Sequence, residues 1–88
     1  MTHLAKLERI RQFVHRTFRE LVDETELELR ETILIQNGQY CGRRFSCDKL
    51  QAVWFVEEGE LKFYGADGAV LNVAAVESVI SEPNRFAA

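Results

Sequence analysis

The sequence predicts a single α+β domain, in which one long N-terminal amphipathic helix packs on an antiparallel β-meander of four to five strands. Three observations favour this fold class. Apolar residues recur every three to four positions up to Asp23, as they do along one side of a helix. After the acidic residues that follow, short extended runs alternate with reversals that mostly contain glycine. With 88 residues, of which 47% are hydrophobic, the chain suits one core.

The helix is expected over about residues 4–23. Thr2 is the expected N-cap residue, because a threonine hydroxyl can accept a hydrogen bond from a free amide of the first turn. A helix of this length spans about 30 Å, enough to cross a small sheet. The pattern also approximates a short coiled-coil heptad, but Arg11 would occupy one of the core positions, so packing on the sheet is the preferred interpretation. The apolar stripe consists of Leu7, Ile10, Val14, Phe18 and Leu21.

The strands are expected to pair as a meander in sequence order, because connections this short permit only antiparallel neighbours. Asn37-Gly38 is a strong hairpin signal, since a type I′ turn needs a positive φ at both central residues. Gly68 should occupy the left-handed position of a three-residue loop. Gly42 lies inside the second run and is a candidate bulge or bend. The extended runs cover residues 32–36, 39–47, 50–56, 61–64 and 69–73.

The C-terminal part of the chain allows two interpretations. Residues 74–80 fit either a short C-terminal helix or a continuation of the last strand. Pro83 ends either structure, and residues 81–88 are expected to form a flexible tail. The ordered part of the single domain, residues 1–88, therefore spans about residues 4–80.

Charge and cysteine content indicate a cytoplasmic protein. Residues 1–20 carry five basic and two acidic residues, a net +3, whereas residues 21–31 carry five acidic residues and one arginine, a net −4. The overall pI near 5.3 argues against nucleic acid as the main partner. Cys41 and Cys47 would lie about 20 Å apart in one strand, too far for a disulfide, and free thiols fit a reducing compartment. No targeting signal and no apolar run long enough for a membrane span is visible.

No catalytic constellation is recognisable, so we expect the chain not to be an enzyme. His3 and His15 would lie more than three helical turns apart and could not share a metal ion. Phosphate-binding and dinucleotide-binding glycine motifs are absent from the sequence. No catalytic residue, cofactor or metal ligand is therefore predicted.

The most promising surface is the sheet face that a single helix leaves uncovered. If Trp54 and Phe63 face the helix, strand alternation places Phe55 and Tyr64 on the opposite face beside Val53, where Cys41 or Tyr40 could join them. An open apolar face of this kind indicates a protein–protein interaction module, with a homodimer as one form of it. Two alternatives would remove the surface: residues 76–80 could fold back over it, or the sheet could curl into a half-barrel.

A second surface follows the strand around the adjacent arginines. Alternation predicts that Tyr40 and Arg44 share one face, while Cys41, Arg43 and Phe45 share the other. An arginine and a stacking ring can bind an anionic ligand or single-stranded nucleic acid, and the basic helix could contribute. The competing interpretation is that the arginines pair with the acidic residues 26–31 and cover aromatic rings. Partner identity, oligomeric state, small ligands and biological process are not predicted.

Overall fold

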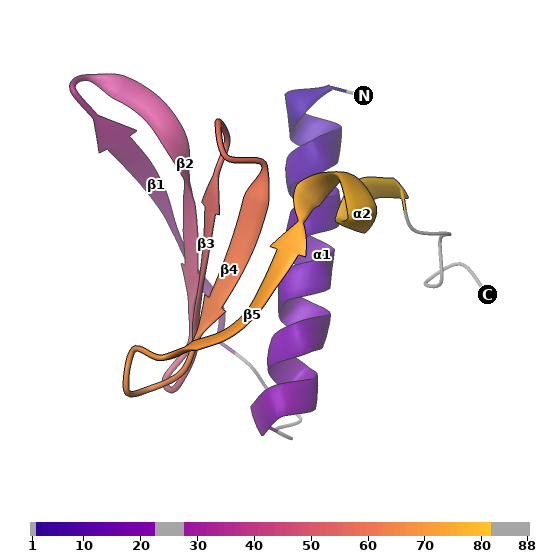
Figure 1. Ribbon diagram of the computed structural model, residues 1–88, viewed down its shortest axis with the longest axis vertical. Helices are drawn as coiled ribbons and strands as arrows, with labels where there is room; N and C mark the ends of the chain where they lie inside the picture. The colour runs from indigo at the N-terminus through magenta and orange to yellow at the C-terminus, as the bar shows by residue number, and fades with distance from the viewer. Residues whose placement is uncertain (1, 23–27, 82–88) are drawn as a thin grey trace.

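The structure is a computed structural model, and it describes residues 2–22 and 28–81. The five strands form one open antiparallel sheet in sequence order. Both helices lie on the same side of this sheet (Figure 1). The predicted α+β fold class is confirmed. The elements are α1 (His3–Val22), β1 (Arg30–Gln36), β2 (Gln39–Ser46), β3 (Gln51–Phe55), β4 (Glu60–Tyr64), β5 (Val70–Ala75) and α2 (Val76–Ser81).

Helix α1 begins and packs as its sequence predicts, up to its last turn. The backbone N–H of Ala5 donates to Oγ1 of Thr2 at 3.1 Å, which confirms Thr2 as the N-cap residue. Leu7, Ile10, Val14 and Phe18 are buried, whereas Leu21, the last member of the predicted stripe, is 50% exposed. Packing of the stripe therefore ends at Phe18. Among the described residues, no helix is long and apolar enough to cross a membrane.

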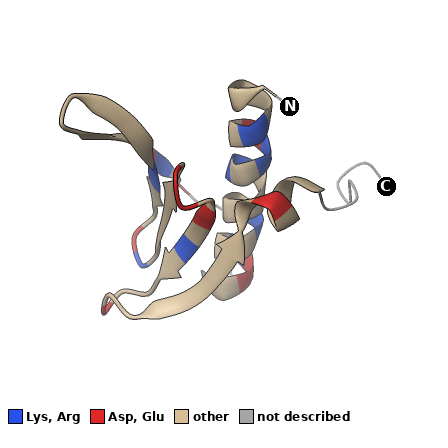
Figure 2. Cartoon of the chain, turned by 45° about the horizontal axis from the view of Figure 1, so that its top comes forward, with Lys and Arg blue, Asp and Glu red and all other residues tan. Residues whose placement is uncertain are grey.

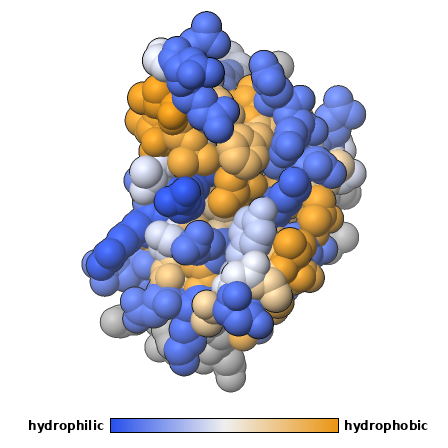
Figure 3. Space-filling model, turned by 60° about the vertical axis from the view of Figure 1, so that its left-hand side comes forward, coloured by the Kyte–Doolittle hydropathy of each residue, from blue (hydrophilic) through white to orange (hydrophobic). Residues whose placement is uncertain are grey.

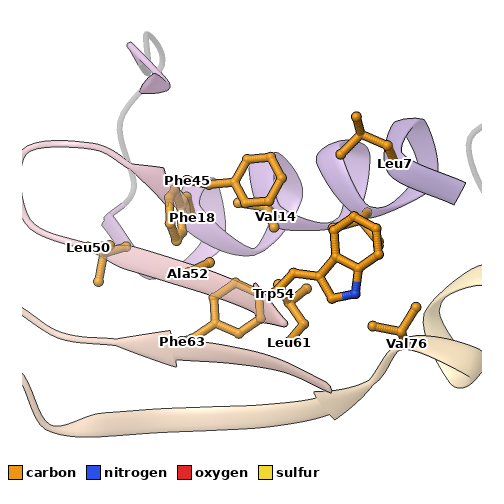
Figure 4. Close-up of a cluster of buried hydrophobic side chains, with 11 residues drawn as sticks. Leu7, Val14, Phe18, Phe45, Leu50, Ala52, Trp54, Leu61, Phe63 and Val76 are labelled. Carbon is orange, nitrogen blue, oxygen red and sulfur yellow. The ribbon is translucent and has the colours of Figure 1, made fainter. Parts of the chain in front are cut away.

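One hydrophobic core lies between the sheet and the helices (Figure 4). Trp54 and Phe63 face α1, as predicted, and both are fully buried. The rings of Phe18 and Phe63 meet edge to face, with centroids 6.0 Å apart. The sheet contributes Phe45, Ala52, Trp54, Leu61 and Phe63 to this core, the residue before β3 contributes Leu50, and α2 contributes Val76.

The reversals have the predicted backbone conformations. Asn37 and Gly38 have φ values of 53° and 76°, which is the type I′ geometry expected of this hairpin. Gly68 has a φ of 82°, so the loop between β4 and β5 uses its glycine in the left-handed region, also as predicted.

The structure combines the two interpretations of residues 74–80. Strand β5 continues through Ala75, and the short helix α2 begins at Val76. Val76 and Val79 are buried on the same side of the sheet as α1. Helix α2 therefore does not cover the opposite face, and the edge strands β1 and β5 do not pair with each other, so the sheet is open. The predicted flexible tail lies, apart from Ser81, outside the described residues.

A β-bulge interrupts the pairing of β1 with β2. Leu34 pairs with Gly42, but the next residue, Ile35, pairs with Tyr40, so Cys41 is an extra residue in β2. The predicted bulge near Gly42 is thus confirmed. Gly42 lies so close to β3 that a Cβ atom there would be 1.9 Å from the carbonyl oxygen of Trp54. Only glycine fits this approach.

Candidate functional site

The face opposite α1 is open and hollowed. Val53 and Phe55 of β3 and Tyr64 of β4 alternate with the buried core residues of their strands, and all three are half-buried. They line a hollow of about 520 Å³ that extends from the β1–β2 hairpin to the loop between β4 and β5. Figure 3 brings this side of the molecule forward and shows apolar patches separated by polar groups. The structure thus brings together Val53, Phe55 and Tyr64, as the sequence predicts.

Charged groups of opposite sign lie on this face. Arg44 is exposed. Of the described residues that line the hollow, Arg44 is the one with a charged side chain. A smaller adjoining hollow of about 280 Å³ shares Phe55 with it and is lined by Glu57 and Glu58. Figure 2 shows these acidic residues in the turn between β3 and β4. The face therefore has a basic part and an acidic part, with an aromatic ring between them. Sequence reasoning assigned Glu57 and Glu58 only to a turn, because their position beside Phe55 depends on how that turn folds.

Tyr40 lies on the helix side, so the prediction that it shares a face with Arg44 is wrong. Its hydroxyl is 3.2 Å from Nε2 of His3 and accepts a hydrogen bond from Nε of Arg43, also at 3.2 Å. The Arg43 guanidinium lies 5.6 Å from the centroid of the Tyr40 ring. The physical reason is the bulge at Cys41, which shifts the alternation of side chains by one residue. Cys41 consequently lines the open face instead of the helix side.

Arg43 belongs to an ion-pair cluster that ties the sheet edge to α1. Glu31 of β1 accepts hydrogen bonds from Nε of Arg11 at 2.8 Å and from Nη1 of Arg43 at 2.6 Å. These contacts confirm for Arg43 the expectation that the arginines of this strand pair with the acidic residues 26–31, of which residues 26 and 27 lie outside the described residues. For Arg44 the expectation is wrong, because Arg44 makes no ion pair with the described residues. Arg43 and Tyr40 are thus engaged in structural contacts, while Arg44 faces the open side.

The remaining candidate groups are dispersed. Cys41 donates from Sγ to the carbonyl oxygen of Leu34 at 3.3 Å, whereas Cys47 packs against the core, and both thiols are free. No family model matches the chain, and comparisons with curated proteins and with solved structures found no significant match. Within residues 2–22 and 28–81, no cluster of histidine, cysteine or acidic side chains could hold a metal ion. Within the described residues, the open face is therefore the candidate functional site.

The Glu31 cluster predicts a specific pH dependence of stability. The hydrogen bond from Arg11, more than any other contact, lowers the pKa of Glu31 below its usual value. A lowered pKa in the folded state means that the cluster stabilises the fold above the unfolded pKa of about 4.3 and loses this effect as the pH falls through the folded value. We expect Glu31→Gln to reduce the free energy of unfolding by about 1 kcal/mol at pH 7, with the difference from wild type vanishing in strong acid.

Urea titrations of both proteins at pH 7 and at pH 2 measure this difference. Glu28→Gln is the matched control, because Glu28 is an exposed carboxylate nearby that makes no ion pair with the described residues. A Glu31→Gln deficit that persists unchanged at pH 2 would contradict the assignment, since a protonated carboxyl no longer forms the ion pairs.

Proposed function

We propose that the chain is a non-enzymatic interaction module that binds another protein chain through its open sheet face. The observation that supports this proposal is the one-sided packing of the helices, which leaves Val53, Phe55 and Tyr64 accessible in a hollow. Val70 and Val73 of β5 extend the apolar surface, since they pair with Tyr64 and Lys62 and are 57% and 45% exposed. Exposed apolar side chains that gather on one face, with polar groups around them, are typical of interaction sites.

Size also favours association. A chain of this length buries only roughly 60–65% of the surface that its unfolded form exposes, so its own core provides a small stability margin. Covering the open face would add apolar burial without a larger chain. A second copy of the chain is the first partner to test. The proposal places the protein in the cytoplasm, where its free thiols would remain reduced.

Phe55→Asp and Tyr64→Asp test this proposal. Each variant introduces a carboxylate into the proposed interface, where desolvation of the charge opposes binding. We expect light scattering to show a dimer of the wild-type chain and a monomer of each variant, with unchanged circular dichroism. Leu4→Asp is the control, because Leu4 is 75% exposed on α1 and should tolerate the same charge without effect on the mass.

The proposal fails if the wild-type chain is a monomer at high concentration and both open-face variants unfold. That result would mean that Phe55 and Tyr64 stabilise the fold itself rather than an interface. Rapid alkylation of Cys41 or Cys47, beyond the rate of an ordinary thiol, would instead point to chemistry at a cysteine.

The second candidate function is binding of an anionic ligand or single-stranded nucleic acid. The exposed Arg44 and the ring of Tyr64 line the same hollow on the open face, which supports it, whereas Tyr40 and Arg43 are engaged on the helix side. Such binding must weaken steeply with salt, because it releases counterions. Amide chemical shifts that do not change when an oligonucleotide is added at low salt would eliminate the nucleic-acid form of this function.

A further inference from the structure

Arg44 and Glu57 lie on opposite sides of Phe55 along the strand direction. Arg44 pairs with Val53 of β3. Val53 precedes Phe55 by two residues on this strand, so the Cα atoms of Val53 and Phe55 are about 7 Å apart. Glu57 belongs to the turn that follows Phe55 on the same strand. Arg44 lines the larger hollow, Glu57 lines the smaller one, and Phe55 lines both. The face therefore carries a positive charge before its central ring and a negative charge after it.

Both charges are available to a partner. In the described part of the chain, Arg44 and Glu57 make no ion pair and no side-chain hydrogen bond, and both are exposed. Their neighbours differ: Glu58 lies 3.6 Å from Nζ of Lys62, and Arg43 is paired with Glu31 at 2.6 Å. The fold thus pairs these two neighbours within the chain, whereas Arg44 and Glu57 have no ion pair among the described residues.

Symmetry restricts how two copies of such a face can meet. Consider two copies whose open faces meet, related by a two-fold axis that lies between the sheets and is perpendicular to the strands at the level of Phe55. This axis places Phe55 against Phe55 of the second copy and reverses the strand direction. The positive end of each face then meets the negative end of the other. An axis parallel to the strands would instead keep the strand direction. Arg44 would then lie at the same height along the strands as Arg44 of the second copy, and Glu57 at the same height as Glu57, and this like-charge arrangement opposes association.

We infer that the open face binds a second copy of the chain in this antiparallel arrangement, with Arg44 of each copy paired to Glu57 of the other. The inference rests on the proposed function and names its partner. Sheets that pack face to face lie about 10 Å apart, so side chains of the second copy would fill the hollow around Phe55 and Tyr64. Two equivalent ion pairs would flank the central rings and select the antiparallel arrangement.

Charge reversal tests this pairing. In Arg44→Glu both members of each proposed pair are acidic, and in Glu57→Arg both members are basic. We expect each single variant to weaken dimerisation at least about tenfold in analytical ultracentrifugation, because like charges then oppose each other twice per dimer. A 1:1 mixture of the two variants should form a heterodimer with nearly wild-type affinity, and the double variant should form a homodimer again.

Arg19→Glu and Glu20→Arg are the matched controls. Both residues are exposed on α1, away from the open face, and their reversal should change the dimerisation constant less than about threefold. Circular dichroism checks that every variant is folded. The mixture adds a readout that misfolding of one variant cannot imitate, because recovery requires both faces to be intact.

The outcomes separate this inference from the proposed function. If Phe55→Asp dissociates the dimer but neither charge reversal weakens it, the docking face stands and the Arg44–Glu57 pairing is overturned. Failure of both the mixture and the double variant to recover affinity overturns the pairing as well. A wild-type chain that stays monomeric at millimolar concentration overturns the inference and removes the homodimer from the proposed function.

Discussion

Replacing Gly42 with alanine is expected to unfold the domain or to leave it only marginally stable. The added Cβ atom would lie 1.9 Å from the carbonyl oxygen of Trp54 and 2.9 Å from its carbonyl carbon. Both atoms belong to the backbone of β3, so no side-chain rotation can relieve the overlap. Strands β2 and β3 would have to separate at the centre of the sheet. We expect a loss of about 3 kcal/mol or more, out of a total that is typically about 5–10 kcal/mol for a small domain.

Urea unfolding followed by circular dichroism measures this loss. Gly65→Ala is the matched control, since the nearest atom to its added Cβ would be Oδ1 of Asp67 at 3.3 Å, and this exposed side chain, which accepts a hydrogen bond from the N–H of Ala69, needs only a small shift. The control should change the free energy of unfolding by less than about 1 kcal/mol. A Gly42→Ala protein as stable as the control would contradict the close approach of β2 to β3.

The parts of the fold that depend on local patterns could be predicted from the sequence. Helix α1 follows from the spacing of its apolar residues, and the first hairpin follows from the φ values that Asn37-Gly38 readily adopts. Alternation along β3 also sufficed to separate Trp54 from Phe55, because this central strand contains no bulge. The open face was therefore predictable as soon as one long helix and one sheet were recognised.

Features that depend on register or on the packing of distant elements could not be predicted. Gly42 signalled a bulge, but which neighbour becomes the extra residue depends on the pairing of β1 with β2. That choice places Cys41 on the open face and moves Tyr40 to the helix side. The contact between Arg11 and Glu31 joins residues 20 positions apart and depends on how α1 crosses the sheet.

The contrast between two adjacent aromatic residues provides the most direct test of which sheet face forms the core. Trp54 is 1% exposed and lies on the helix side, where its ring stacks on His3 with centroids 5.6 Å apart, whereas Phe55 is half-buried on the open face. Trp54→Ala would leave a cavity in the centre of the core, and we expect it to cost about 3–5 kcal/mol. For Phe55→Ala we expect about 1 kcal/mol, because the ring leaves no enclosed cavity.

Thermal or urea unfolding should compare both variants with the wild type at protein concentrations low enough to keep the chain monomeric, so that loss of an interface does not enter the comparison. Under these conditions Trp54→Ala should be largely unfolded near 37 °C, while Phe55→Ala should retain a cooperative transition. Equal losses for the two variants would mean that Phe55 is part of the monomer core. The open face would then be unavailable to a partner, because the side chain at its centre would already be committed to folding.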